Sequence, residues 1–181
     1  MDYRIEKDTL GEVKVPKDSL WGAQTERSKK NFKIGNPSSM PIEIIHAYAI
    51  LKTSAAAAKH ELGVLPKEKS ELIQAVCDEI ISNKHNEQFP LVIWQTGSGT
   101  QTNMNANEVI SNHVIKKLKG RIGSKKPIHP NDHVNLSQSS NDTFPTIMHV
   151  AINELSIKDL IPNLKDLIKE FQKNDAPPRS P

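Results

Sequence analysis

Two segments of the chain gather polar side chains of the kind that hold an anion. The first, residues 96–109, reads TGSGTQTNMNANEV. Gly97 and Gly99 allow a tight backbone path, while Ser98 and Thr100 place hydroxyls beside the free N–H groups of a helix start. Free N–H groups and the helix dipole favour a bound anion. A capped helix after a glycine turn explains the same residues, so both interpretations stay open on this segment alone.

Three asparagines follow on the same expected helix, Asn103, Asn105 and Asn107. Asparagine is a poor residue for a helix interior, so three of them cost stability and indicate a function. No Gly-Lys-Ser or Gly-Lys-Thr follows the glycines, which argues against a nucleotide triphosphate.

The second segment, residues 129–145, reads HPNDHVNLSQSSNDTFP. It places six polar side chains in a row, residues 137–142, ahead of an expected helix whose dipole again favours an anion. An ordinary helix cap needs only one of them. The cluster of His129, Asn131, Asp132 and His133 is, taken alone, more typical of a polar surface turn than of a metal site.

Apolar periodicity predicts a mainly helical protein with a small β-hairpin at residues 3–15. The expected helices cover residues 42–62, 67 to about 80, 102–119, 143–157 and 160–171. A bend is expected near Pro162, because proline cannot donate a helix hydrogen bond. The expected buried stripe of helix 42–62 is Ile44, Tyr48, Leu51, Ala55, Ala58 and Leu62.

The composition restricts the class of partner. The chain has 181 residues, enough for one domain or for one domain and the start of another. A net charge of +3, from 24 Lys and Arg against 21 Asp and Glu, suits a small anionic metabolite and argues against nucleic acid.

Cys77 is the only cysteine, so no intramolecular disulfide forms. No signal peptide or membrane span is expected, which predicts an intracellular protein without a membrane partner.

Three motifs in this order and spacing resemble the class II fumarate hydratases of the fumarase and aspartase superfamily. They are WGAQTERS (residues 21–28), TGSGTQTNMNANEV and HPNDHVNLSQSSNDTFP, and the resemblance extends over residues 3–171. It implies reversible hydration of fumarate to L-malate by a cytoplasmic enzyme of the tricarboxylic acid cycle. It also implies a homotetramer built on a helical bundle, with no cofactor and no metal.

The resemblance also assigns residues and domains. It implies that the substrate carboxylates are held by Ser98, Thr100, Ser139, Ser140 and Asn141. A secondary dicarboxylate site is implied at Lys126, His129, Asn131 and Asp132, where the family often has an arginine at the position of Lys126. No catalytic acid or base is assigned, because the corresponding family segments are expected downstream. The implied division is an N-terminal lyase domain, 1–138, and a truncated beginning of the central helical domain, 139–181.

Two alternatives remain. Aspartate ammonia-lyases share the fold, but they usually read Ser-Thr-Asn-Asp where this chain has Ser-Ser-Asn-Asp at residues 139–142. The other alternative is a noncatalytic helical interaction fragment. It is favoured by the lack of the family's acid-base segments in this sequence and by the tail at 174–181, which carries no core-forming residue.

Overall fold

The fold is a small β-hairpin beside a set of α-helices. The computed structural model describes residues 2–174. In chain order the elements are β1 (Tyr3–Asp8), β2 (Gly11–Pro16), α1 (Ala23–Asn31), α2 (Ile42–Glu61), α3 (Lys67–Ile81), the 3-10 turn η1 (Asn86–Gln88), α4 (Thr100–Lys117), the π turn η2 (Pro130–Val134), α5 (Ser140–Leu155), the π turn η3 (Ser156–Leu160) and α6 (Ile161–Asn174).

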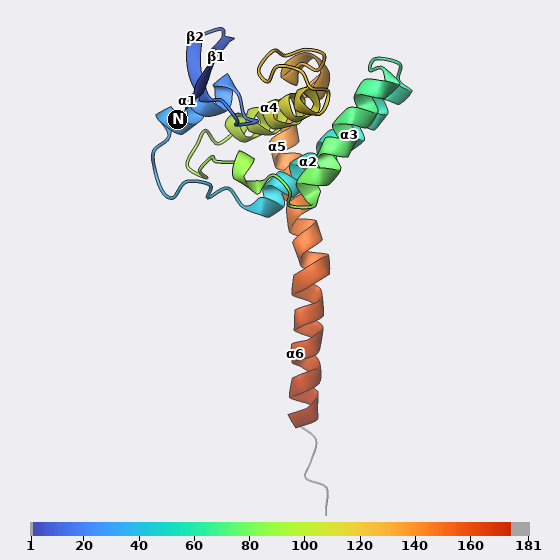
Figure 1. The fold of residues 1–181 in the computed structure, drawn as a ribbon. Helices are drawn as coiled ribbons and strands as arrows, with labels where there is room; N and C mark the ends of the chain where they lie inside the picture. Colours follow the sequence, from blue (N-terminus) through green and yellow to red (C-terminus); the bar gives the residue numbers. More distant parts are fainter. Residues whose placement is uncertain (1, 175–181) are drawn as a thin grey trace, which may run out of the picture.

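These elements form a head from which one long helical rod projects (Figure 1). The antiparallel hairpin pairs Tyr3 with Pro16 and Asp8 with Gly11, and it lies beside α1 at one side of the head. Helices α2 and α3 pack on each other, and α4 crosses the head between them and α1. A single core of buried apolar side chains joins the hairpin to helices α1 to α5.

Most of the predicted elements are confirmed, with shifts at their ends. The hairpin, α2 and α3 begin where the sequence predicts. Helix α4 begins at Thr100, two residues earlier than predicted, because Gly99 caps it in a left-handed conformation with φ of 63°. Helix α5 begins at Ser140, where the Ser139 hydroxyl accepts a hydrogen bond from the Asn141 N–H. Helix α1 was not predicted at all.

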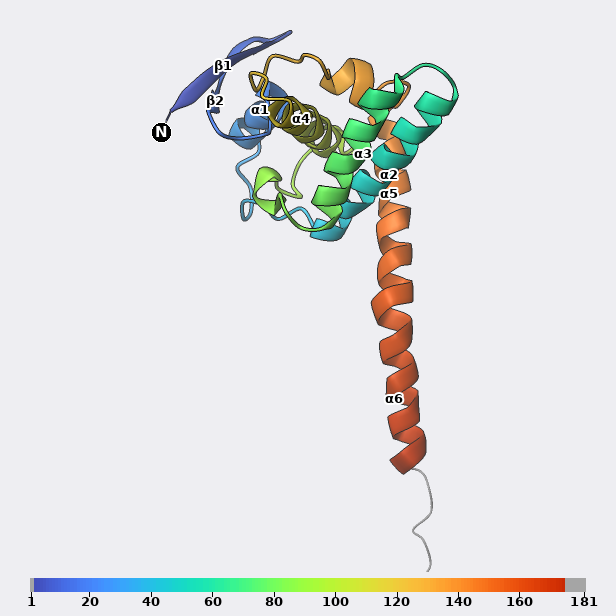
Figure 2. The same cartoon turned by 45° about the vertical axis from the view of Figure 1, so that its right-hand side comes forward.

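The predicted bend near Pro162 is wrong, because α5, η3 and α6 continue as one rod (Figure 2). Ser156 and Ile161, at the two ends of η3, both have right-handed helical dihedrals. Within η3 the Ile161 N–H reaches back to the Ser156 carbonyl, one residue further than in an α-helix. This wider turn moves away the upstream carbonyl that the Pro162 ring would otherwise strike, so the rod does not kink.

Two buried carboxylates hold the start of α1. Glu108 of α4 accepts hydrogen bonds from the backbone N–H groups of Gly22, Gln24 and Thr25 at 2.8, 2.8 and 3.1 Å, and from the Thr25 hydroxyl at 2.7 Å. Glu6 of β1 accepts a hydrogen bond from the backbone N–H of Ala23 at 3.1 Å. A Cβ on Gly22 would lie 2.8 Å from Glu6 and 2.9 Å from Glu108. The absence of a side chain there lets both carboxylates reach the positive end of the α1 dipole.

The rod leaves the head and carries exposed apolar side chains along η3 and α6. Leu160, Leu164 and Phe171 are 55%, 48% and 62% exposed. None of the helices within residues 2–174 has the length and apolar character needed to cross a membrane. The predicted coreless tail lies outside the described residues from position 175 onward.

We predict that Glu108→Gln lowers the free energy of unfolding by about 2–4 kcal/mol. The amide would turn an N–H₂ toward backbone N–H groups, leaving buried donors without acceptors. Urea denaturation followed by circular dichroism measures the change. Glu12→Gln, which alters an exposed glutamate of β2, is the matched control. Equal unfolding midpoints for the two variants would show that Glu108 is not the anchor of α1.

Candidate functional site

The N-termini of α4 and α5 meet through a chain of hydroxyl groups. Ser98 Oγ lies 3.0 Å from Thr100 Oγ1, which lies 2.9 Å from Ser140 Oγ. Thr100 and Ser140 are the first residues of α4 and α5. Ser98 and Thr100 are exposed, and Ser140 is half-buried. The structure therefore brings together three of the five predicted substrate-binding hydroxyl and amide residues, 40 positions apart in the chain.

The two helix ends can approach because position 99 has no side chain. Gly99 is buried, and a Cβ added to it would lie 2.1 Å from the ring of Phe144 in the first turns of α5. Its φ of 63° is also a conformation that residues with a side chain rarely adopt. The ring of Phe144 thus packs directly on the backbone that starts α4, and this contact places Thr100 beside Ser140.

The other two predicted residues lie at the same end of α5. Ser139 caps the helix, with its hydroxyl accepting from the Asn141 N–H at 3.3 Å, and both side chains are exposed. The first N–H groups of a helix have no partner within the helix, and two dipoles here present positive ends to one surface. Hydroxyls and free N–H groups at two converging helix starts are suited to hold a carboxylate.

A buried lysine fixes the loop that leads into this site. Lys52 of α2, 1% exposed, donates to Asn103 Oδ1 at 2.8 Å, Asn135 Oδ1 at 3.1 Å and Gln138 Oε1 at 2.8 Å. Each amide donates its own N–H₂ elsewhere: to Asn135 Oδ1, to the Gln138 carbonyl and to the Val134 carbonyl in turn. All three amide oxygens consequently face the lysine, and three acceptors use all three protons of an ammonium group.

Burial, together with the charge of Lys59, lowers the pKa of Lys52 to about 7. Lys59 itself, whose pKa burial lowers to about 8, donates to the carbonyls of His133 and Val134 at 2.6 and 3.1 Å. These two lysines tie α2 to the loop before α5. Sequence reasoning missed both, although their spacing was a signal: they fall on the same helix face as Tyr48, which is fully buried.

The three asparagines of α4 are all buried, and they do not share one role. Asn103 belongs to the Lys52 network. Asn105 donates to the Gln88 carbonyl at 3.1 Å, and Asn107 has only the sulfur of Met104 at 3.7 Å. The side-chain oxygens of Asn105 and Asn107 are buried without a partner within residues 2–174. Only Asn103 is connected to the candidate site.

The predicted secondary site is only partly assembled. The Nδ1 atom of His129 accepts from the backbone N–H groups of Asn131 and Asp132, both at 3.2 Å, and lies 3.4 Å from the Asp132 carboxylate. This ring nitrogen caps η2, which leaves Nε2 as the nitrogen that can meet a ligand. Lys126 is exposed, and within the described part of the chain its ammonium has no hydrogen bond or ion pair to the other three residues.

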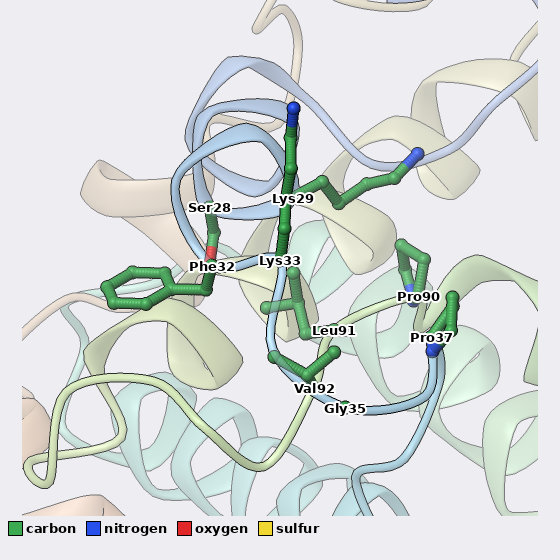
Figure 3. Close-up of a pocket in the computed structure, with 9 residues that line it drawn as sticks. All are labelled: Ser28, Lys29, Phe32, Lys33, Gly35, Pro37, Pro90, Leu91 and Val92. Carbon is green, nitrogen blue, oxygen red and sulfur yellow. The ribbon is translucent and has the colours of Figure 1, made fainter.

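A separate hollow beside α1 does not coincide with either set of residues (Figure 3). It has a volume of about 300 Å³ and is lined by Ser28, Lys29, Phe32, Lys33, Gly35, Pro37, Pro90, Leu91 and Val92. Its two lysine side chains point in different directions. Lys29 is engaged elsewhere, 3.6 Å from Glu26 and 4.4 Å from the ring centroid of Trp21. The hollow therefore lacks the convergent donors of the hydroxyl site.

Comparison with known proteins places this arrangement in a family. The profile of a family described as lyases matches residues 11–176, so the chain belongs to that lyase family. The class II fumarate hydratase of Pasteurella multocida is 60% identical over 177 residues, which are 97% of this chain and 38% of that protein. The corresponding protein of Bacillus subtilis is 58% identical over 167 residues, 92% of this chain and 36% of that protein.

A solved structure gives the same result for the fold. The crystal structure of a recombinant class II fumarase from Schistosoma mansoni has a TM-score of 0.88 to this chain at 43% sequence identity. The match covers 93% of this chain and 35% of the other. The chain thus has the fumarase fold, as the sequence predicted, and spans little more than a third of the length of the relatives it matches.

We predict that Gly99→Ala lowers the free energy of unfolding by about 2–5 kcal/mol, from the left-handed backbone and from the clash with Phe144. In a Phe144→Leu background, where the ring is gone, the same change should cost less by about 1–3 kcal/mol. A double-mutant cycle from urea denaturation measures this coupling. If the two changes are additive, the ring does not pack on Gly99 as described.

Proposed function

We propose that the protein to which this chain belongs hydrates fumarate reversibly to L-malate, and that this chain supplies donors for the substrate carboxylates. The observation that carries the proposal is the hydroxyl chain Ser98–Thr100–Ser140 at two converging helix starts. Ser139 and Asn141 complete the proposed set at the start of α5. The names and high identity of the relatives support fumarate and malate as the substrate pair.

The chemistry explains why such donors are useful. In the dehydration direction, a base removes the proton on the carbon next to a carboxylate, and negative charge moves into that carboxylate to give an aci-carboxylate dianion. Hydroxide then leaves from the neighbouring carbon with the help of an acid. Hydroxyl and N–H donors fixed at two helix ends stabilise the dianion more than the substrate, which lowers the barrier. No step of this scheme requires a cofactor.

The remaining parts of the proposal concern the complete protein. The catalytic acid and base belong to segments beyond the portion that this chain shares with its relatives. We place the boundary between an N-terminal lyase domain and a central helical domain after residue 138, just before the α5 cap. The exposed apolar side of α6 suits a subunit of a homotetrameric helical bundle. The proposed setting is the cytoplasm and the tricarboxylic acid cycle.

A second dicarboxylate site is proposed at the η2 turn. The turn holds His129, Asn131 and Asp132 together and leaves the His129 Nε2 atom available. Lys126 keeps a positive charge nearby in the sequence but lacks the two-pronged geometry of arginine, so this site should bind dicarboxylates weakly.

The nearest alternative, aspartate ammonia-lyase, differs in the leaving group, so a product assay distinguishes the two activities. The test uses a chimera in which residues 1–171 replace the matching part of the Pasteurella multocida enzyme. Incubation with fumarate and ammonium should yield malate and no aspartate. Aspartate as the main product would reject hydration as the function.

We predict that Thr100→Val in this chimera lowers kcat/KM for fumarate hydration by roughly ten- to a thousand-fold, the usual effect of losing one polar stabiliser. Valine keeps the shape of threonine, so the circular dichroism spectrum and melting temperature should change little. Thr9→Val, in the hairpin turn, serves as the matched control. Equal kcat/KM for the two variants would show that Thr100 does not stabilise the substrate carboxylate.

A further inference from the structure

Three side chains that could bind a metal ion meet between the end of α3 and the C-terminal half of α4. Glu79 lies in the last turn of α3, His85 in the connection that follows, and His113 on α4. Glu79 Oε2 is 3.1 Å from His85 Nε2 and 2.8 Å from His113 Nε2. The three ligand atoms all lie within 4.8 Å of one another, and the group is the only one of its kind within residues 2–174.

The spacing of these atoms fits a coordination sphere. With metal–ligand distances near 2.0–2.1 Å, two ligands of a tetrahedral ion are separated by about 3.3 Å. The two measured separations are within about half an ångström of that value, so small side-chain rotations suffice to admit an ion. Two imidazoles and one carboxylate are also a ligand set that zinc and other first-row transition ions accept.

The three side chains are shielded from solvent, and the pKa shifts of His113 and Glu79 favour the neutral imidazole and the carboxylate that a metal requires. The side chains of His113, His85 and Glu79 are 11%, 16% and 23% exposed. Burial, together with the charge of His85, lowers the pKa of His113. Burial alone would raise the pKa of Glu79, but hydrogen bonds from Lys117 and His85 and the charge of His113 outweigh it and lower the pKa to about 2.

We propose that Glu79, His85 and His113 form a binding site for a divalent transition-metal ion, with Zn²⁺ as the best fit, and that the bound ion fastens α3 to α4. Three protein ligands leave a fourth position for water. An ion that binds only the folded chain stabilises it by mass action, so the bound ion should raise the melting temperature. The ion links Glu79 of α3 to His113 of α4, two residues that are more than 30 positions apart in the chain.

Two features of the cluster set how tightly the ion binds. Lys117, one helical turn beyond His113, forms an ion pair with Glu79 and so competes with the ion for the carboxylate. Within residues 2–174, His113 Nδ1 is buried without a hydrogen-bond partner. Metal-binding histidines usually donate this second N–H to an acceptor, and loss of that acceptor weakens binding by roughly ten- to a hundred-fold. The site is therefore of moderate affinity, and removing Lys117 should strengthen it.

The test is titration of the metal-free 181-residue chain with Zn²⁺ by calorimetry, and with Co²⁺ by visible absorption. Wild type should bind one ion per chain, show the d–d absorption of a cobalt ion held by nitrogen and oxygen, and melt at a higher temperature with Zn²⁺. His85→Ala should weaken binding at least roughly tenfold, the scale on which coordination contacts act. Lys117→Gln should tighten it. His60→Ala, an exposed histidine on α2, should change nothing and controls for adventitious binding.

His85 lies outside the helices, so its alanine variant should keep the fold. An unchanged circular dichroism spectrum would verify this. Glu79→Gln, which preserves shape and removes the charged ligand, gives a second variant with the same expected loss. Equal Zn²⁺ affinity in wild type and in either variant would overturn the proposal. So would the absence of zinc binding to wild type at 100-fold excess over the protein, which would leave the cluster as an ion pair between α3 and α4.

Discussion

Two helix starts can share one surface only if their backbones come close, and in this chain that approach depends on Gly99. The Phe144 ring occupies the space where a side chain at position 99 would lie. The contact sets α4 against α5 and brings Thr100 within hydrogen-bonding distance of Ser140. Both helix dipoles then act on the same region, which one helix start could not achieve. The anion-binding role proposed for the site depends on this single packing constraint.

The interior that supports the site contains buried polar and charged side chains. The Lys52 ammonium donates to the amide oxygens of Asn103, Asn135 and Gln138. Glu108 accepts hydrogen bonds from three backbone N–H groups at the start of α1. Such groups are costly to bury unless every polar atom is satisfied. Here they are satisfied within their networks, so each acts as a fastener between elements distant in sequence. Rigid support of this kind keeps donors aimed at a ligand without reorganisation.

Local patterns in the sequence predicted the hairpin and helices α2 to α6, since these depend on neighbouring residues, but they did not predict α1. The anion-binding role of the two polar segments stays a prediction. The buried face of α2 was displaced by about one residue. Ala58 is exposed and Leu62 is 78% exposed, whereas Lys52 and Lys59 are buried. A sequence pattern predicts that a lysine faces solvent. The partners that allow these two lysines to be buried lie more than 50 positions away in the chain. The predicted bend failed for a related reason: Pro162 identifies a missing donor but not the π turn that accommodates it.

In the proposed function, this chain holds the substrate carboxylates while other segments perform the acid and base chemistry. The most direct test of this proposal follows the ultraviolet absorbance of fumarate with three samples: the chain alone, the separately expressed remainder of the Pasteurella multocida enzyme, and their mixture. Hydration should appear only in the mixture, because binding groups without an acid and base give little rate. Hydration by the chain alone, or a mixture unaffected by Thr100→Val in the chain, would contradict the account.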